Sequence, residues 1–533
     1  MIVGKLTAFC LASLMSLPCF ADAEKDSLNR ENHLFYKELN YLGNMYEGTA
    51  NPVALSHNIV RKVTDVRVGA QLRNGGLHDI DEGRRSRNLM GAIGGLQNFG
   101  NLDLWGYLDY KNIKEYDRQW NSTLFVTPTN PFILGDNIKS DVNTEVFSMT
   151  AGASYKFNDL FTGAVSINYL TGSASDQTDP RPKTNSMHVE IKPGVEFRLN
   201  DTHSVGVSAM ADIFRSDMSY SVVNNNINYT YYIMKGMGDH QVLTSNDMTS
   251  YPRDYEGTRF QGALQWLVTP ASDRFSNMFE VSYTHNKEIS EDGGYAYTFK
   301  SGDYYRDDIN IYDRLSIRSS GRFRQNFILR ASYVTGSGDW YDQKKMTDTQ
   351  HGNIIYYQIL NKSKVMETTD VNASLTYQAD FMRNDMPDLT VNADLGFNTS
   401  EAKQYSTAAF KQTYTNMVIG AGAVKHFKFG RLRLSGRAGG YYSMPLGDPE
   451  YACAGMNMSS AYCAPAFEYI ASAKLGFNVE ADAYLPVTLY GYTTWMGVNL
   501  RFASCMYQGD SKFSDVYDSA ACTFVDATFN IKF

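Results

Sequence analysis

Two neighbouring segments of the chain alternate strictly between apolar and polar residues. In residues 371–381 one face carries small aliphatic and aromatic side chains, while amides, hydroxyls and a carboxylate lie between them, and residues 388–397 repeat this order. Alternation with a period of two predicts β-strands with two unlike faces. Such strands of about ten residues are typical of a transmembrane barrel, in which one face meets lipid and the other meets the lumen.

The same unit recurs along the chain from Val66 onward: an alternating segment, a short turn, a second alternating segment and a longer polar loop. Short turns are predicted near 98–101, 158–160, 199–203, 269–274, 319–325, 382–387, 428–431 and 484–487. Long loops are predicted at 75–87, 116–144, 174–185, 217–254, 288–308, 337–367, 400–412, 445–466 and 504–522. We therefore predict an all-β, transmembrane antiparallel β-barrel of about 16–18 strands with long extracellular loops and a short N-terminal segment.

The exact number of strands depends on residues 88–99, which are rich in glycine and ambiguous. A soluble propeller or two-sheet protein is the structural alternative. A propeller repeats about every 40 residues, and no such period is present. The asymmetry between short and long loops also favours the barrel.

The segment "CTFVDATFNIKF", residues 522–533, is another two-faced strand. An exposed strand edge is an aggregation hazard unless it is paired, so we expect this strand to close the barrel by pairing with the first strand, "TDVRVGAQLR". The motif "ATFNIKF" resembles the signal of outer-membrane proteins inserted by the barrel assembly machinery. The resemblance implies that Phe533 is the insertion signal.

The N-terminal residues divide into two expected parts. Residues 1–23 have a lysine, an apolar run too short to span a membrane and an A-x-A site, which together predict a secretory signal peptide. Residues 24–61 precede the first strand and are rich in aromatic residues; they predict either a plug inside the lumen or a periplasmic lead-in under the barrel rim. Residues 62–533 are the predicted barrel.

Composition agrees with an exported barrel. The mean hydropathy of −0.37 is in the range of soluble proteins, which is also expected of a transmembrane barrel because only every second strand residue meets lipid. The net charge of −8 suggests no nucleic-acid partner. In an exported protein, the four cysteines outside the signal favour disulfides, and their spacing suggests Cys453 with Cys463 and Cys505 with Cys522, although three connectivities exist.

Alternation also predicts charged groups of both signs on the lumen face. In a hydrated pore such groups set ion selectivity, and the arginines favour anions. The alternative role is a salt-bridge network that stiffens the wall. The lumen candidates are Arg314, Arg318, Arg330, Arg433, Arg437, Arg501, Glu190, Lys192 and Glu196.

Over its length, the chain resembles a family of large, uncharacterised outer-membrane barrels of Bacteroidota. The carriers of the resemblance are the signal peptide, the tyrosine-rich strands and the segment "YLGNMYEGTANPVALSHN". Within it, Asn51-Pro52 and the following Val53-Ala54 are similar to the Asn-Pro-Ala hatch motif of long-chain fatty-acid transporters. Val53 replaces the alanine of that motif, which weakens the carry-over of a hydrophobic substrate.

These observations predict a protein of the Gram-negative outer membrane that acts as a channel or transport-associated barrel for small polar or nutrient-like solutes. A surface receptor or subunit of an uptake complex with a blocked lumen is the first alternative, and a hydrophobic-substrate transporter is the second. The mature chain carries no hydrolase or metalloprotease motif, so we expect no enzyme activity and no cofactor. Expected partners are outer-membrane lipid and lipopolysaccharide, the barrel assembly machinery, and a surface lipoprotein or a TonB-dependent transporter.

Overall fold

A computed structural model describes residues 43–246, 250–272, 274–294, 297–350, 352–384, 386–405, 410–453, 458–489, 492–513, 516–517 and 520–533. The predicted signal peptide lies outside these residues, as does the first part of the predicted N-terminal segment. None of the described helices is long and apolar enough to cross a bilayer.

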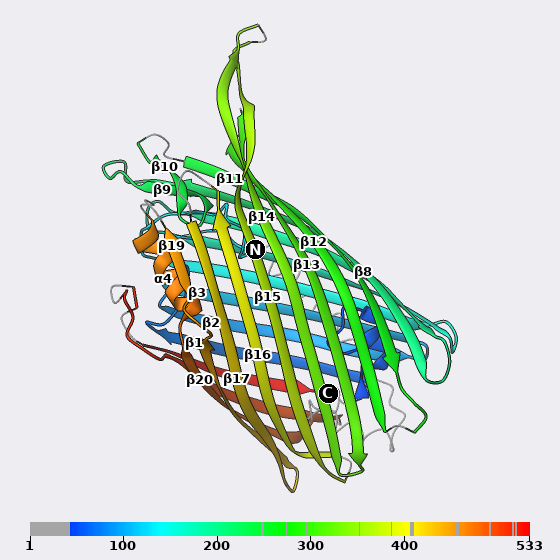
Figure 1. Cartoon of the computed structure of the whole chain (residues 1–533). Helices are drawn as coiled ribbons and strands as arrows, with labels where there is room; N and C mark the ends of the chain where they lie inside the picture. Colours follow the sequence, from blue (N-terminus) through cyan, green and yellow to red (C-terminus); the bar gives the residue numbers. More distant parts are fainter. Residues whose placement is uncertain are drawn as a thin grey trace.

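Over the described residues, eighteen antiparallel strands form one closed barrel (Figure 1). They are β1 (Lys62–Gly75), β2 (Arg85–Phe99), β3 (Leu102–Arg118), β5 (Ser140–Lys156), β6 (Phe161–Asp176), β7 (Lys183–Arg198), β8 (His203–Ser221), β11 (Ser250–Val268), β12 (Phe275–Gly294), β13 (Tyr297–Ser320), β14 (Phe323–Asp348), β15 (Ile354–Arg383), β16 (Met386–Gln404), β17 (Phe410–Phe429), β18 (Leu432–Pro445), β20 (Lys474–Leu489), β21 (Tyr492–Tyr507) and β22 (Ala521–Lys532).

The barrel closes between its first and last strands, as predicted. β1 pairs with β22 from Asp65 opposite Lys532 to Gly75 opposite Cys522. The glycine-rich residues 88–99 belong to β2, which fixes the number of wall strands at the upper end of the predicted range.

The two faces of each strand differ in exposure because one meets lipid and the other meets the lumen. In β8 every second residue from Gly206 to Tyr220 is buried. On the opposite face, Val207 is 42% exposed and Ile213 is 58% exposed. The same outward face on other strands carries exposed apolar residues, among them Val68, Leu72, Leu89, Phe260, Leu264, Tyr283, Leu395, Leu500 and Phe529. A band of this kind must be covered by hydrocarbon.

Several predicted loops are in fact continuations of wall strands. The prediction of a loop at 337–367 was wrong, because β14 and β15 remain paired as far as Asp348 opposite Ile354 and form a hairpin that rises above the barrel rim (Figure 1). The loop predicted at 288–308 is likewise mostly β12 and β13. The turn predicted at 484–487 was also wrong: these residues pair with β21 inside β20.

A second, smaller sheet lies among the long loops at the same end of the barrel. It contains β4 (Leu134–Gly135), β9 (Thr230–Gly236) and β10 (Asp239–Thr244). Three further short elements are η1 (Pro52–His57) before β1, β19 (Glu450–Cys453) beside β17, and the consecutive η2 (Ser459–Cys463) and α4 (Ala464–Ala471) between β19 and β20.

Candidate functional site

The N-terminal residues from Asn44 to His57 lie against the inner face of the wall. The Tyr312 hydroxyl donates to the Glu47 carbonyl at 3.1 Å, and Arg314 Nη1 donates to the Asn44 carbonyl at 3.0 Å. The backbone N–H of Ala50 donates to Glu280 Oε2 at 2.9 Å. Ile311, next to Tyr312, and Phe279, next to Glu280, are exposed on the opposite, lipid-facing side of these strands, so this segment lies inside the barrel.

Asn51 of the predicted hatch motif fixes this segment to the wall. Its side-chain oxygen accepts from the Val53 N–H and caps η1, and its Nδ2 donates to Gln265 Oε1 at 3.0 Å. Glycines on the wall make room for it: a Cβ at Gly194 would lie 2.2 Å from Asn51 Oδ1, and one at Gly206 would lie 2.9 Å from Asn51 Nδ2. Asn51 is therefore occupied by structural contacts, and sequence reasoning did not identify the two glycines.

Side chains beside η1 add apolar and ionic contacts. Met45 and Tyr46 are buried against a wall cluster of Leu267, Met278, Tyr312 and Ile328. His57 Nε2 lies 2.8 Å from Glu196 Oε2, and the His57 ring lies 4.7 Å from the Tyr46 ring. This end of the lumen is therefore occupied by residues of the same chain.

The opposite end is entered by residues 119–139, which connect β3 to β5 and which we term the lid loop. The Phe132 carbonyl accepts from Tyr255 OH at 2.9 Å and from Arg253 Nη1 at 3.2 Å. Arg253 is 0% exposed, and its Nη2 is 2.7 Å from Asp292 Oδ2. A buried guanidinium held by a buried carboxylate is a rigid donor, so the loop is anchored by its backbone.

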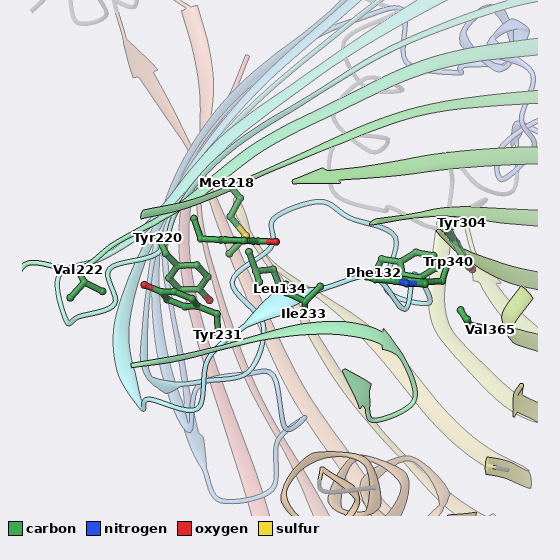
Figure 2. Packing of buried hydrophobic residues seen from close by; sticks show 11 residues of the cluster. Phe132, Leu134, Met218, Tyr220, Val222, Tyr231, Ile233, Tyr304, Trp340 and Val365 are labelled. Atoms are coloured by element: carbon green, nitrogen blue, oxygen red, sulfur yellow. The ribbon is translucent and has the colours of Figure 1, made fainter. Parts of the chain in front are cut away.

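The Phe132 side chain fills a space that two wall glycines leave open. A Cβ at Gly302 would lie 2.6 Å from the Phe132 ring, and one at Gly338 would lie 2.9 Å from Pro131 Cγ. The ring of Trp340 lies 6.2 Å from the Phe132 ring, and Figure 2 shows the two side by side near Tyr304. Both glycines therefore leave room for the lid loop at this point of the inner wall.

Glu288 holds the lid loop on the other side of Phe132. Its Oε2 accepts from Asn130 Nδ2 at 2.7 Å, and its carboxylate also accepts from the N–H and hydroxyl of Thr127. The hydroxyls of Thr129 and Tyr304 are hydrogen-bonded. The lid loop therefore satisfies polar groups of the inner wall that would otherwise need water.

Other loops pack over the lid loop from outside. Leu134 pairs with Ile233 across β4 and β9, within a buried cluster that includes Tyr220 and Tyr231 (Figure 2). A second cluster joins Ile80, Trp120, Met234 and Met458, which come from separate loops. Tyr231 and Trp340 are thus core residues of this layer.

Two buried carboxyls sit in the outer layer. Asp81 Oδ2 accepts from Tyr462 OH at 3.1 Å and from Asn121 Nδ2 at 3.3 Å. Burial, followed by the nearby charge of Asp79, raises the pKa of Asp81 to about 7. Burial also raises the pKa of Asp136, in the lid loop, to about 6. Burial therefore shifts the ionisation equilibrium of both carboxyls towards the neutral form.

Burial of inward residues is unequal around the wall. On β8 the inward residues Met210, Asp212, Phe214 and Met218 are all buried. On the other side of the barrel a row of alternating charges crosses β18, β20, β21 and β22 in register, and its members are Arg437, Glu480, Arg501 and Asp526. Arg501 is exposed, and Arg437 and Glu480 are partly exposed. Opposite charges in adjacent positions stabilise the sheet and leave this wall polar.

The predicted lumen residues fall into distinct environments. Arg314 is fully buried under the N-terminal segment, and Glu196 contacts His57. Arg330 and Arg501 alternate with lipid-facing residues and are exposed. The remaining candidates are partly exposed in ion pairs or lie near the short turns: Glu190 with Lys192 at 2.8 Å, Arg433 with the Gly430 carbonyl, Arg437 in the charge row, and Arg318 at the end of β13. Sequence reasoning missed Asp526, which accepts from Gln71.

The predicted disulfides are not present in the part of the chain that the structure describes. Cys463, Cys505 and Cys522 form no disulfide there, and the side chain of Cys453 lies outside the described set. Cys505 is directly opposite Cys522 in the register of β21 and β22. The strand ladder holds these two residues in register without a bridge.

In a closed antiparallel barrel, the backbone N–H and C=O groups of every strand are hydrogen-bonded to a neighbouring strand, so the barrel can lie within lipid. Together with the apolar outer band, this defines the class of the protein: it is a β-barrel of the Gram-negative outer membrane. A family model described as "Family of unknown function (DUF6850)" matches residues 52–533, and the chain belongs to this family. No curated protein matches its sequence. Origin in Bacteroidota stays a prediction.

Solved structures with similar chains are transporters and receptors by their descriptions. The RagAB peptide transporter has 7% identity and a TM-score of 0.41, over 89% of this chain and 86% of that chain. BauA, the ferric preacinetobactin receptor of Acinetobacter baumannii, has 8% identity and a TM-score of 0.38, over 88% and 80%. FyuA, the ferric yersiniabactin uptake receptor of Yersinia pestis, has 8% identity and a TM-score of 0.38, over 88% of this chain and 80% of that chain. Function therefore has to be argued from this chain's own residues.

Proposed function

We propose that the protein is a gated, transport-associated barrel for small polar solutes. The observation that carries this proposal is the docking of the lid loop inside the lumen, with the Phe132 carbonyl held by Arg253 and Tyr255. For solutes to pass through the lumen, the lid loop must be released from this contact. The N-terminal segment from Asn44 to His57 is proposed to act as the plug at the other end.

The class of solute is inferred from the wall that these segments leave accessible. Arg437, Glu480 and Arg501 line that wall with both signs of charge. An apolar solute gains nothing from such a surface, whereas a hydrated polar or zwitterionic solute exchanges hydrogen bonds with it. This argues against the hydrophobic-substrate alternative, since Asn51 of the hatch motif is also occupied by the wall.

The proposal is tested by solute flux into liposomes that contain the purified protein. Neutral sugars, amino acids and small anions of similar size are compared for the wild-type protein and for Phe132→Ala with residues 24–60 deleted. The proposal expects slow flux in the wild type and fast flux of polar solutes in the doubly altered protein. Flux that stays slow when both segments are released contradicts the proposed passage.

The alternative of a surface receptor or complex subunit is supported by a different observation. The hairpin of β14 and β15 extends above the rim and exposes Ile354, Tyr356, Ile359 and Leu360. Isolated two-stranded hairpins are marginally stable, and exposed apolar groups on one suit contact with another protein. Under this alternative, deletion of residues 343–361 removes partner binding and leaves liposome flux unchanged.

A further inference from the structure

A cationic patch lies on the outer face of the barrel at the upper edge of the lipid-facing band. Leu72, Leu89 and Tyr110 are exposed apolar residues on the outward faces of β1, β2 and β3. Toward the long loops, the next residues on the same face of β2 are Arg87 and then Arg85, both exposed. Along β2 this face changes from apolar at Leu89 to cationic at Arg87, two residues further on. Such a change is expected at the level where lipid headgroups begin.

The cations come from two paired strands. Arg87 is directly opposite Lys114, and Arg85 is directly opposite Tyr116. Both Arg85 Cζ, at 3.9 Å, and Lys114 Nζ, at 4.8 Å, lie over the Tyr116 ring. Like charges directly across a ladder repel each other, so this arrangement is unfavourable unless an anion lies between them.

Carboxylates of the protein supply only part of the needed charge. Lys114 Nζ is 3.1 Å from Asp141 Oδ2. Glu145 on the neighbouring strand accepts a hydrogen bond from Tyr110. Among the described carboxylates, none forms an ion pair with Arg85 or Arg87. Within the described residues, these two exposed arginines are thus left without a carboxylate that neutralises their charge.

An outward arginine at a similar level elsewhere shows the contrasting case. Arg215 on β8 follows the exposed Ile213 on the same face, and its guanidinium lies 3.1 Å from Asp217 and 3.5 Å from Glu256. Its charge is neutralised by the protein. The absence of such carboxylates beside Arg85 and Arg87 is therefore a local feature of β2 and β3.

We propose that Arg85, Arg87 and Lys114 bind a phosphate group of a lipid headgroup of the outer leaflet, namely the phosphorylated glucosamine of lipopolysaccharide. Two arginines two residues apart on one face are about 7 Å apart, which allows both to reach one phosphate through paired N–H donors. The acyl chains of the same lipid then lie against Leu72 and Leu89. One lipid would satisfy both the charged and the apolar part of the patch.

The test measures binding of lipid A to the full-length purified protein in detergent by native mass spectrometry. The double variant Arg85→Gln with Arg87→Gln is compared with the wild type and with the matched control Arg215→Gln. Loss of two charge-assisted contacts is expected to weaken lipid A binding at least about 10-fold, and the control is expected to change it less than about 2-fold. Lipid A from which phosphate has been removed is expected to bind the wild type as weakly as it binds the double variant.

Folding is checked by the shift in gel mobility that unheated barrels show, and all three proteins must show it. Equal binding of lipid A to the wild type and to the folded double variant overturns the proposal. Inorganic phosphate serves as the second probe. If it binds with the same dependence on Arg85 and Arg87 while lipid A does not, the site is one for free phosphate and the assignment to a lipid is overturned.

Discussion

Substitution of Phe132 by alanine is expected to loosen the lid loop without altering the wall. The Phe132 side chain is 0% exposed, and it fills the space above Gly302 and Gly338. Removal of a buried phenylalanine side chain costs about 3–5 kcal/mol. Because each 1.4 kcal/mol is about a factor of ten, the ratio of docked to released lid should fall roughly 10²- to 4 × 10³-fold.

Limited proteolysis of the reconstituted protein measures this change. A nonspecific protease added from the loop side cleaves residues 124–134 only when the lid loop is released, and the rate follows the released fraction when docking is fast. Cleavage sites are mapped by mass spectrometry. The matched control is Val242→Ala in β10, where the side chain is 50% exposed and the expected change is less than about threefold. Equal protection of residues 124–134 in Phe132→Ala and wild type would refute the docking account.

Three further predictions concern other contacts. Gly194→Ala places a Cβ 2.2 Å from Asn51 and is expected to release the N-terminal segment, measured as protease cleavage of residues 44–57, whereas Gly262→Ala, with open space around it, should leave that segment protected. Asp292→Asn leaves the buried Arg253 without its charge partner and should lower barrel stability by about 3–5 kcal/mol, measured as a lower temperature for the gel-mobility shift; an unchanged temperature would contradict it. The pKa of Asp81 is raised to about 7 in the closed outer layer, so the protonated form stabilises that layer, and closure is strongest near pH 4 and weakens as pH rises through 7. Protease cleavage of the outer loops should therefore increase from pH 5 to pH 8, and Asp81→Asn should reduce this increase. An identical increase in the variant would exclude Asp81 as its cause.

The barrel could be predicted from sequence because lipid imposes a period of two on every strand. The pairing of β1 with β22 followed from the alternation at both ends. The prediction failed where strands leave the membrane. In β14 and β15 above the rim, residues such as Lys344 and Gln358 are polar on a solvent-exposed ladder, so no lipid-facing periodicity marks them as strand. The turn predicted at Pro486 failed because β20 continues through that proline near its end.

The occupied lumen was only partly predictable. The aromatic content of residues 24–61 suggested that they are buried against other parts of the protein. The hatch-like motif at Asn51 lies in the segment that enters the lumen, but there Asn51 caps η1 and binds the wall and does not indicate a hydrophobic substrate. The lid loop gave no comparable signal, because "TPTNPFILG" reads as an ordinary extracellular loop. Its docking depends on Arg253, Glu288 and two glycines far away in sequence, and these residues meet only once the wall has formed. The wall charges were predicted by alternation, but their division into covered and accessible groups depends on which loops fold inward.

Single-channel conductance of the purified protein in a planar bilayer tests the central claim most directly, namely that segments of the chain itself close the lumen. The account predicts no steady current from the wild-type protein, and stable current when Phe132→Ala is combined with deletion of residues 24–60. Steady current from the wild type, unchanged by the combined alteration, would contradict the claim and leave an open channel.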